Sequence, residues 1–264
     1  MFRGSRKHVL DWTDRPEFSV ELLQLVAPID CRLSARSRWM PRGHHLPDEA
    51  RLETFGPEAL PNVETWSSLR KWWLAHEGGA NTPNWDIAAS CEIEGRSGLI
   101  LVEAKANVPE LSAAGKPVDA GASAASAANH ERIRLAINEA CTALKDISTS
   151  TAISRDSHYQ LSNRVAFAWK LASLGVPTVL AYLGFWGDEG IADAGLPFEH
   201  AAHWEAVFGA YGHSVVPKEL FDRRIDCAAA PMWLLVRSRR VLESSQPRLS
   251  NPAMEPSAEP PSIK

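Results

Sequence analysis

The amino-acid sequence predicts an α/β protein in which a central mixed β-sheet is flanked by helices. The aliphatic run at residues 99–102 is typical of a strand that is covered on both faces, and the apolar run at residues 179–185 is typical of a buried strand. Longer segments whose apolar residues recur at helical spacing lie before and after these runs. A short turn at residues 94–98 joins the first run to a preceding strand, which predicts an antiparallel pair. Together these observations predict a mixed sheet.

Sequence patterns place the elements of this fold in chain order. A helix is expected at residues 63–76, where Val63, Trp66, Leu69 and Trp73 form one apolar stripe. The two strands of a hairpin follow at residues 84–93 and 98–105. The remaining expected elements are a mobile loop rich in Ala, Ser and Gly at 109–129, helices at 130–147, 158–174 and 198–211, and strands at 179–185 and 232–237.

Length and composition place the chain among ordinary globular proteins. Its 264 residues can form one large domain or two small ones, and 45% of them are hydrophobic while 23% are charged. No stretch approaches the roughly 18 to 20 apolar residues of a membrane span, and the N-terminus lacks the apolar segment of a signal peptide. We therefore expect a cytoplasmic protein without a membrane partner. The four cysteines lie far apart, so neither a zinc site nor a disulfide framework is indicated.

The chain divides into three parts. Residues 1–61 are expected to be an N-terminal extension, residues 62–243 the α/β domain, and residues 244–264 a disordered tail rich in Pro and Ser. The extension contains an acid-free basic stretch at residues 32–46, in which Trp39 lies among four arginines and two histidines. The net charge of −4 argues against a generally basic nucleic-acid-binding surface. The basic stretch itself can be a local phosphate-binding patch or a solvated loop.

The hairpin carries the residues that point most directly to a function. Alternation along the first strand places Asp86 on the face opposite Ile87, and alternation along the second places Glu103 and Lys105 on one face. Folding the strands back on each other brings the start of the first strand, at Asp86, beside the end of the second. Two carboxylates and a lysine are therefore expected at one place.

Two carboxylates and an ammonium group suit metal-dependent hydrolysis of a phosphodiester. A divalent cation can supply a hydroxide near neutral pH and neutralise the charge that develops at phosphorus. Mg²⁺, or Mn²⁺ in its place, prefers oxygen ligands and keeps several waters, so Asp86, Glu103 and the carbonyl of Ala104 are the expected protein ligands. Lys105 would stabilise the transition-state charge or orient the attacking water.

Residues 83–105 resemble the PD-(D/E)xK phosphodiesterase superfamily, which includes many restriction endonucleases and repair nucleases. Asp86 matches the first acid, and Glu103 and Lys105 match the E-x-K element, which occurs only once in the chain. Asn84 and Trp85 separate the proline from the acid, which departs from the pattern. The resemblance extends more weakly to about residue 186. It implies a restriction-endonuclease-like core, catalytic roles for the three matching residues, and a nuclease whose expected nucleic acid is DNA.

The helix at residues 158–174 carries two further candidates. Gln160 and Arg164 lie one turn apart and therefore share a helix face. Helices that follow the E-x-K strand in several families of the superfamily present a glutamine or a basic residue to the site, so the resemblance implies substrate-binding roles for both. Ser157 and Gln160 also fit a capping box, which is a structural alternative for Gln160. Arg164 is expected to point toward the site, and Lys170 toward solvent.

Two other interpretations remain open. The same fold can belong to a catalytically inactive binding or assembly protein that grips nucleic acid or a protein partner through the basic stretch or an exposed aromatic surface. Alternatively, Glu103 and Lys105 form only a salt bridge in an unrelated α/β domain, and Asp86 is a turn or capping residue. The sequence does not distinguish DNA from RNA as substrate, endonuclease from exonuclease activity, or one oligomeric state from another.

Overall fold

The computed structural model describes residues 2–55, 60, 63–78, 80–118, 121–188, 190 and 195–241. The helices are α1 (Gly4–Thr13), α2 (Phe18–Val26), α3 (Leu52–Phe55), α4 (Val63–Trp73), α5 (Ala124–Lys145), α6 (Tyr159–Ser173) and α7 (Ala201–Gly212). The strands are β1 (Cys31–Arg32), β2 (Trp39–Met40), β3 (Ile87–Ile93), β4 (Arg96–Lys105), β5 (Thr178–Trp186), β6 (Arg224–Asp226) and β7 (Pro231–Arg240). Short 3-10 helices are η1 (Gly43–His45), η2 (Val108–Glu110) and η4 (Lys218–Leu220). The tail predicted at residues 244–264 lies outside the described residues.

The strands form one mixed sheet. The seven described strands follow the order β1-β3-β4-β5-β7-β6, and β2 pairs with β3 beside this path. β3 and β4 form the antiparallel hairpin, whereas β4 and β7 both run parallel to β5. The predicted class, an α/β fold with a central mixed sheet flanked by helices, is confirmed. The restriction-endonuclease-like core remains a prediction.

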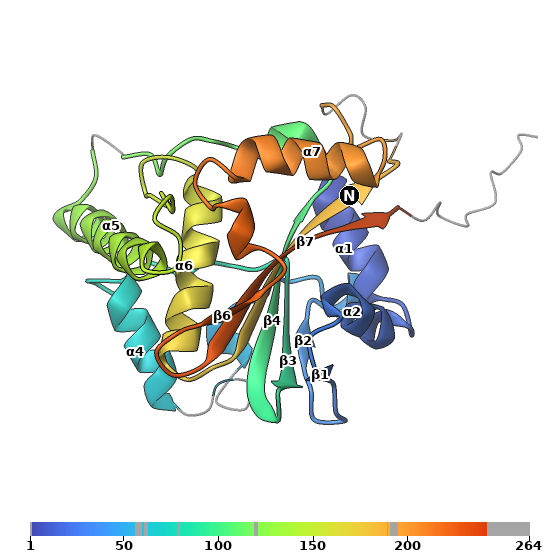
Figure 1. Cartoon of the computed structure of the whole chain (residues 1–264), viewed down its shortest axis with the longest axis horizontal. Coiled ribbons are helices and arrows are strands. Elements are labelled where there is room, and N and C mark those ends of the chain that lie inside the picture. Colours follow the sequence, from blue (N-terminus) through green and yellow to red (C-terminus); the bar gives the residue numbers. More distant parts are fainter. Residues whose placement is uncertain are drawn as a thin grey trace, which may run out of the picture.

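Helices cover both faces of the sheet and bury its central strands (Figure 1). α4, α5, α6 and α7 contribute to the hydrophobic cluster on one face, whereas α1 and α2 contribute to the cluster on the other. Along β4, Leu99 and Leu101 belong to the first cluster, and Ile100 and Val102 belong to the second. Burial on both faces therefore explains the uninterrupted aliphatic run. None of the described helices is both long enough and apolar enough to cross a membrane.

The N-terminal segment supplies a helical layer of the same core. Val9 and Trp12 of α1 and Phe18 of α2 are buried in one cluster with residues of the central strands. The ring of Trp12 lies edge-on to that of Phe185 on β5, with the centroids 6.4 Å apart. Residues 1–61, expected to be an extension, thus contain the helices that cover one face of the sheet.

The loop predicted at residues 109–129 is shorter than expected. α5 already begins at Ala124, because Ser123 caps it by accepting a hydrogen bond from the amide of Ser126 at 3.2 Å and the alanine-rich sequence favours a helix. Before α5, the carbonyls of residues 113–114 accept hydrogen bonds of 2.9 and 3.0 Å from the amides at the start of α6. Part of the predicted mobile loop is therefore helical, and another part is bonded to α6.

Replacing Gly184 of β5 by alanine should destabilise the fold. A Cβ atom at this position would lie 2.2 Å from Cδ2 of Trp204, a fully buried side chain of α7. Because the core encloses this indole, α7 must shift, and we expect the free energy of unfolding to fall by about 3 kcal/mol in urea denaturation. Gly78, whose added Cβ would meet no atom within 4 Å, is the matched control. A Gly184→Ala protein as stable as Gly78→Ala would contradict the close packing of α7 on β5.

Candidate active site

Asp86 and Glu103 lie opposite each other at the open end of the hairpin. Ile87 and Val102 are the last pair in the register of β3 and β4, so the next pair is Asp86 and Glu103. Partners that lie directly across an antiparallel pair point to the same face of the sheet. Asp86 Oδ2 accepts a hydrogen bond from the amide of Ala104 at 2.8 Å, which holds this carboxylate beside the end of β4.

The six residues predicted as site residues line one pocket of about 470 Å³. These residues are Asp86, Glu103, Ala104, Lys105, Gln160 and Arg164. Ser5, Glu49, Asn84, Trp85 and Glu110, which the sequence analysis did not assign to the site, complete the lining. The pocket therefore joins the end of the hairpin to α6, to the first turn of α1 and to the loop that precedes α3.

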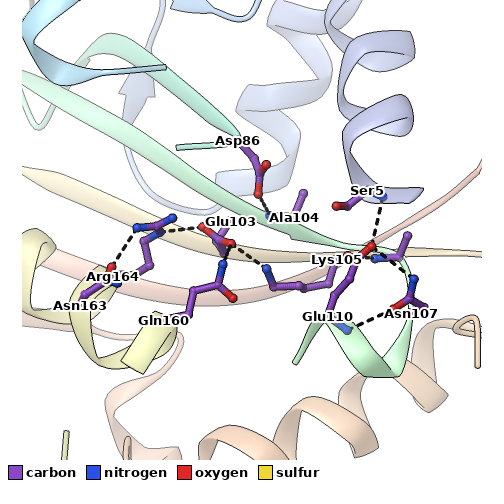
Figure 2. A network of polar contacts seen from close by, with 11 residues as sticks. Ser5, Asp86, Glu103, Ala104, Lys105, Asn107, Glu110, Gln160, Asn163 and Arg164 are labelled. Carbon is purple, nitrogen blue, oxygen red and sulfur yellow. Dashed lines mark hydrogen bonds and ion pairs between the residues drawn. The ribbon is translucent and has the colours of Figure 1, made fainter. Parts of the chain in front are cut away.

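Glu103 is the centre of the polar network in this pocket (Figure 2). Its Oε1 accepts hydrogen bonds from Lys105 Nζ at 2.7 Å and from Gln160 Nε2 at 2.6 Å. Its Oε2 accepts one from Arg164 Nε at 2.6 Å. Glu103 is only 2% exposed, so these donors replace the water that an ionised carboxylate needs.

The two carboxylates have opposite pKa shifts. Burial by itself would raise the pKa of Glu103, but the positive charges of Arg164 and Lys105 outweigh it and lower this pKa to about 2. Asp86 keeps partial contact with solvent, yet burial, followed by the negative charge of Glu103, raises its pKa to about 7. Near neutral pH, Glu103 is therefore ionised, whereas Asp86 is protonated in part of the molecules. Pairs of carboxyl groups with separated pKa values are typical of catalytic sites.

Gln160 binds the site carboxylate instead of capping its helix. The residue before α6 is His158, which has φ 45° and makes no side-chain capping hydrogen bond. The predicted capping box of Ser157 and Gln160 was therefore wrong. The carbonyls of residues 113–114 satisfy the amides at the start of α6, which leaves the Gln160 side chain free to donate to Glu103.

Arg164 points toward the site as expected. In addition to its bond with Glu103, Nη1 donates to Asn163 Oδ1 at 2.8 Å, and the guanidinium carbon lies 4.8 Å from the ring centroid of Trp85. The residue is 9% exposed, and the charge of Glu103 raises the pKa of Arg164 although burial alone would lower it. Its guanidinium is therefore a fixed positive charge beside Glu103.

Lys170, which was predicted to face solvent, is partly covered. Its Nζ donates to Glu139 Oε1 of α5 at 2.9 Å and lies 5.3 Å from the ring of Trp72. Only 17% of its side chain is exposed. The prediction was wrong because α5 and α4 pack beside this face of α6 and offer a carboxylate and an aromatic ring.

Glu110 connects the pocket to α1. Its Oε2 accepts a hydrogen bond from the amide of Ala106 at 2.9 Å, and its Oε1 accepts weaker ones from Asn107 Nδ2 at 3.3 Å and from the amide of Ser5 at 3.5 Å. Asn107 Oδ1 accepts the amide of Glu110 in return, at 3.1 Å. A sequence signal for this arrangement exists, because Asn107-Val-Pro-Glu110 fits a capping pattern with proline near the helix start.

Glu49 reaches the pocket from a loop that lies far away in the sequence. The backbone groups of Ala50 and Trp85 pair with each other at 2.8 and 3.0 Å, which fixes this loop to the start of β3. Glu49 Oε2 then accepts a hydrogen bond from Asn84 Nδ2 at 3.0 Å. No local pattern marks Glu49, because its position depends on a contact between segments that are distant along the chain.

The donor set fits a magnesium or manganese ion that keeps most of its waters. Within the described residues, no three His, Cys, Asp or Glu side chains form a group that could hold a metal ion. Mg²⁺, however, is commonly bound through one or two carboxylates, with waters and substrate oxygens as further ligands. Asp86 Oδ1 accepts no hydrogen bond from the described residues, and Glu103 Oε2 accepts only the one from Arg164. Oxygen lone pairs on both acids are therefore available.

The basic stretch at residues 32–46 lies outside the pocket lining. Two of its basic side chains have local partners: the Arg42 guanidinium lies 4.6 Å from the ring of Trp39, and His44 Nε2 lies 2.8 Å from Asp11 Oδ1. Both interpretations of the stretch, a phosphate-binding patch and a solvated loop, stay open.

Asp86→Asn should stabilise the protein in a pH-dependent manner. Because the pKa of Asp86 is about 7 instead of the ordinary 3.8, the folded protein binds more protons than the unfolded chain between these two values. The stability of the parent therefore falls as the pH rises through this window. Asparagine keeps an acceptor for the Ala104 amide but carries no charge. We expect Asp86→Asn to be more stable than the parent by about 1 to 3 kcal/mol at about pH 8, and by little at about pH 4.

Chemical denaturation of both proteins across this pH range measures the difference. Asp146→Asn, at the C-terminal end of α5, is the control, because Asp146 lies outside the pocket lining. A stability difference between Asp86→Asn and the parent that stays constant from acid to alkaline pH would contradict the raised pKa of Asp86.

Comparison of the chain with protein-family models, with curated proteins and with solved structures gives no match. What the site can do is therefore inferred from its own residues and their geometry. The feature to be explained is a buried, ion-paired Glu103 opposite an Asp86 of raised pKa, in a pocket that also contains a lysine and an arginine.

Proposed function

We propose that this protein is a metal-dependent nuclease that hydrolyses phosphodiester bonds, with DNA as the expected substrate. The observation that carries the proposal is the convergence of Asp86, Glu103 and Lys105 in one pocket, with Glu103 held by Lys105 Nζ at 2.7 Å. Two carboxylates for a divalent ion and a neighbouring ammonium for the transition-state charge are what this reaction requires. The resemblance of residues 83–105 to the PD-(D/E)xK pattern supports the same proposal.

Each side chain has a distinct part in the proposed reaction. Asp86, Glu103 and the carbonyl of Ala104 would hold Mg²⁺ or Mn²⁺, which lowers the pKa of bound water and neutralises charge on the substrate phosphate. The Lys105 ammonium, fixed by Glu103, would orient the attacking water and stabilise charge on the phosphate oxygens. Gln160 keeps Glu103 in position by donating to its Oε1.

The charge balance of the pocket also suits a phosphodiester. When both acids are ionised, Asp86 and Glu103 offset Lys105 and Arg164, so these four side chains together carry no net charge. A bound divalent cation raises the net charge of this group to +2, and the single negative charge of a phosphodiester lowers it to +1. Ion and substrate are therefore expected to strengthen each other's binding.

The alternative is a binding or assembly protein that keeps the nuclease-like arrangement without catalysis. One observation favours it: Glu103 Oε1 already accepts two hydrogen bonds, and the residue is almost fully buried. In that case the network would only join β4 to α6. Nucleic-acid binding without cleavage is the outcome that separates this alternative from the enzyme.

Purified protein should cleave nucleic acid in the presence of Mg²⁺ or Mn²⁺. We expect Asp86→Asn, Glu103→Gln and Lys105→Met each to lower the cleavage rate by about a hundredfold or more, because each removes a ligand or a preorganised charge. Lys105→Met should still bind the ion, since it leaves both carboxylates in place. The assay measures cleavage of single-stranded DNA, double-stranded DNA and RNA, with and without a chelator.

Lys145→Met, at the last turn of α5, is the matched control for Lys105→Met and should retain the parent rate. Thermal melting of every variant separates loss of activity from loss of fold. If the parent cleaves none of the three substrates with either metal, the nuclease proposal fails. If Lys105→Met is as active as the parent, the role assigned to Lys105 fails.

A further inference from the structure

Arg164 is held too firmly to act as a mobile phosphate clamp. Its Nε donates to Glu103 Oε2 at 2.6 Å and its Nη1 donates to Asn163 Oδ1 at 2.8 Å. The guanidinium also lies over the ring of Trp85, a fully buried side chain, at 4.8 Å. Among the described residues, Nη2 is left without a hydrogen-bond partner, and Arg164 lines the pocket. The side chain thus places one permanent positive charge at a fixed point on the pocket wall.

The guanidinium lies beside Glu103 Oε2, on the side of this carboxylate where a second metal ion could be bridged. Two-metal phosphodiesterase sites hold their ions about 3.5 to 4 Å apart and bridge them through shared carboxylates. In the proposed site Glu103 shares an ion with Asp86, and its Oε2, the oxygen that could bridge to a second ion, already accepts a hydrogen bond from Arg164 Nε. A second cation on that side of Glu103 would meet the guanidinium at close range, where like charges repel strongly in a buried site.

The other acids of the pocket are engaged elsewhere. Glu110 accepts hydrogen bonds from the amides of Ala106 and Ser5, and Glu49 accepts one from Asn84 Nδ2. The bonds of Glu110 hold η2 beside α1, and the bond of Glu49 holds the loop before α3 beside the start of β3. No third His, Cys, Asp or Glu side chain among the described residues forms a metal-binding group with Asp86 and Glu103, so these two carboxylates are the pair available to an ion.

We propose that Arg164 occupies the place of a second metal ion, so that this site binds a single divalent cation. The inference rests on the proposed function. Asp86 and Glu103 hold the one ion, and Nη2 of Arg164 stabilises charge on a phosphate oxygen from the opposite side of Glu103. A guanidinium suits this task because it keeps its charge when buried and its planar donors match phosphate oxygens.

Counting bound Mn²⁺ tests the proposal directly. In equilibrium titrations of the full chain, followed by the loss of the free-ion EPR signal, we expect the parent to bind one Mn²⁺ in this pocket. Arg164→Met retains apolar contact with Trp85 but removes the charge, so we expect it to bind Mn²⁺ at least about tenfold more tightly, or to bind a second ion. Its cleavage rate should nevertheless fall by about a hundredfold or more.

Two further variants separate charge from packing. Arg164→Lys keeps a positive charge and should show neither tighter Mn²⁺ binding nor a second ion. Lys170→Met removes a cation from the same helix, where it contacts Glu139 outside the pocket, and should bind Mn²⁺ as the parent does. A merely structural role of Arg164 predicts instead that Arg164→Met loses metal affinity, activity and thermal stability together.

The outcomes distinguish this inference from the proposed function. If the parent binds two Mn²⁺ ions and Asp86→Asn binds neither, the single-ion inference is overturned and the nuclease proposal still stands. Weaker Mn²⁺ binding by Arg164→Met would overturn it as well. A parent protein that binds no Mn²⁺ in this pocket, even with a non-cleavable phosphodiester present, would overturn both. If Arg164→Met does not fold, the number of Mn²⁺ ions that the parent binds and the Mn²⁺ affinity of Arg164→Lys still test the inference.

Discussion

The buried carboxylate of Glu103 is the constraint on which the arrangement of the site depends. It lies at the end of a central strand, is 2% exposed, and can remain ionised there only because Lys105, Gln160 and Arg164 donate to it. These bonds fix the start of α6 against β4, which in turn defines the pocket. Removing one partner of such a buried group leaves the other uncompensated, so the network acts as a unit.

The site contains features that oppose stability, which is typical of functional positions. Asp86 has a raised pKa because burial and the nearby charge of Glu103 disfavour its ionised form. His158 has φ 45° at the start of α6, a conformation that a non-glycine residue adopts at a cost of about 1 to 3 kcal/mol. This turn precedes the helix that carries Gln160 and Arg164.

Local rules made the hairpin predictable, whereas the surroundings of the site depend on distant contacts. Asp86, Glu103 and Lys105 could be placed together because strand alternation and a short turn suffice, and the aliphatic runs gave the α/β class. The capping box considered as an alternative for Gln160 was wrong, because the local pattern does not include the buried Glu103 carboxylate that accepts the Gln160 amide. The helices at residues 4–26 have short apolar stripes, and their packing on the sheet follows from tertiary contacts that no single segment encodes.

The central claim is that Asp86 and Glu103 jointly hold a divalent cation. Its most direct test is a crystal structure of the protein with Mn²⁺ and a non-cleavable phosphodiester, with the ion located by its anomalous scattering. The account predicts a peak between the two carboxylates, at about 2.0 to 2.6 Å from an oxygen of each, with a phosphate oxygen as a further ligand. Mn²⁺ that is absent from this pocket at saturating concentration, while the Glu103 network stays unchanged, would contradict it.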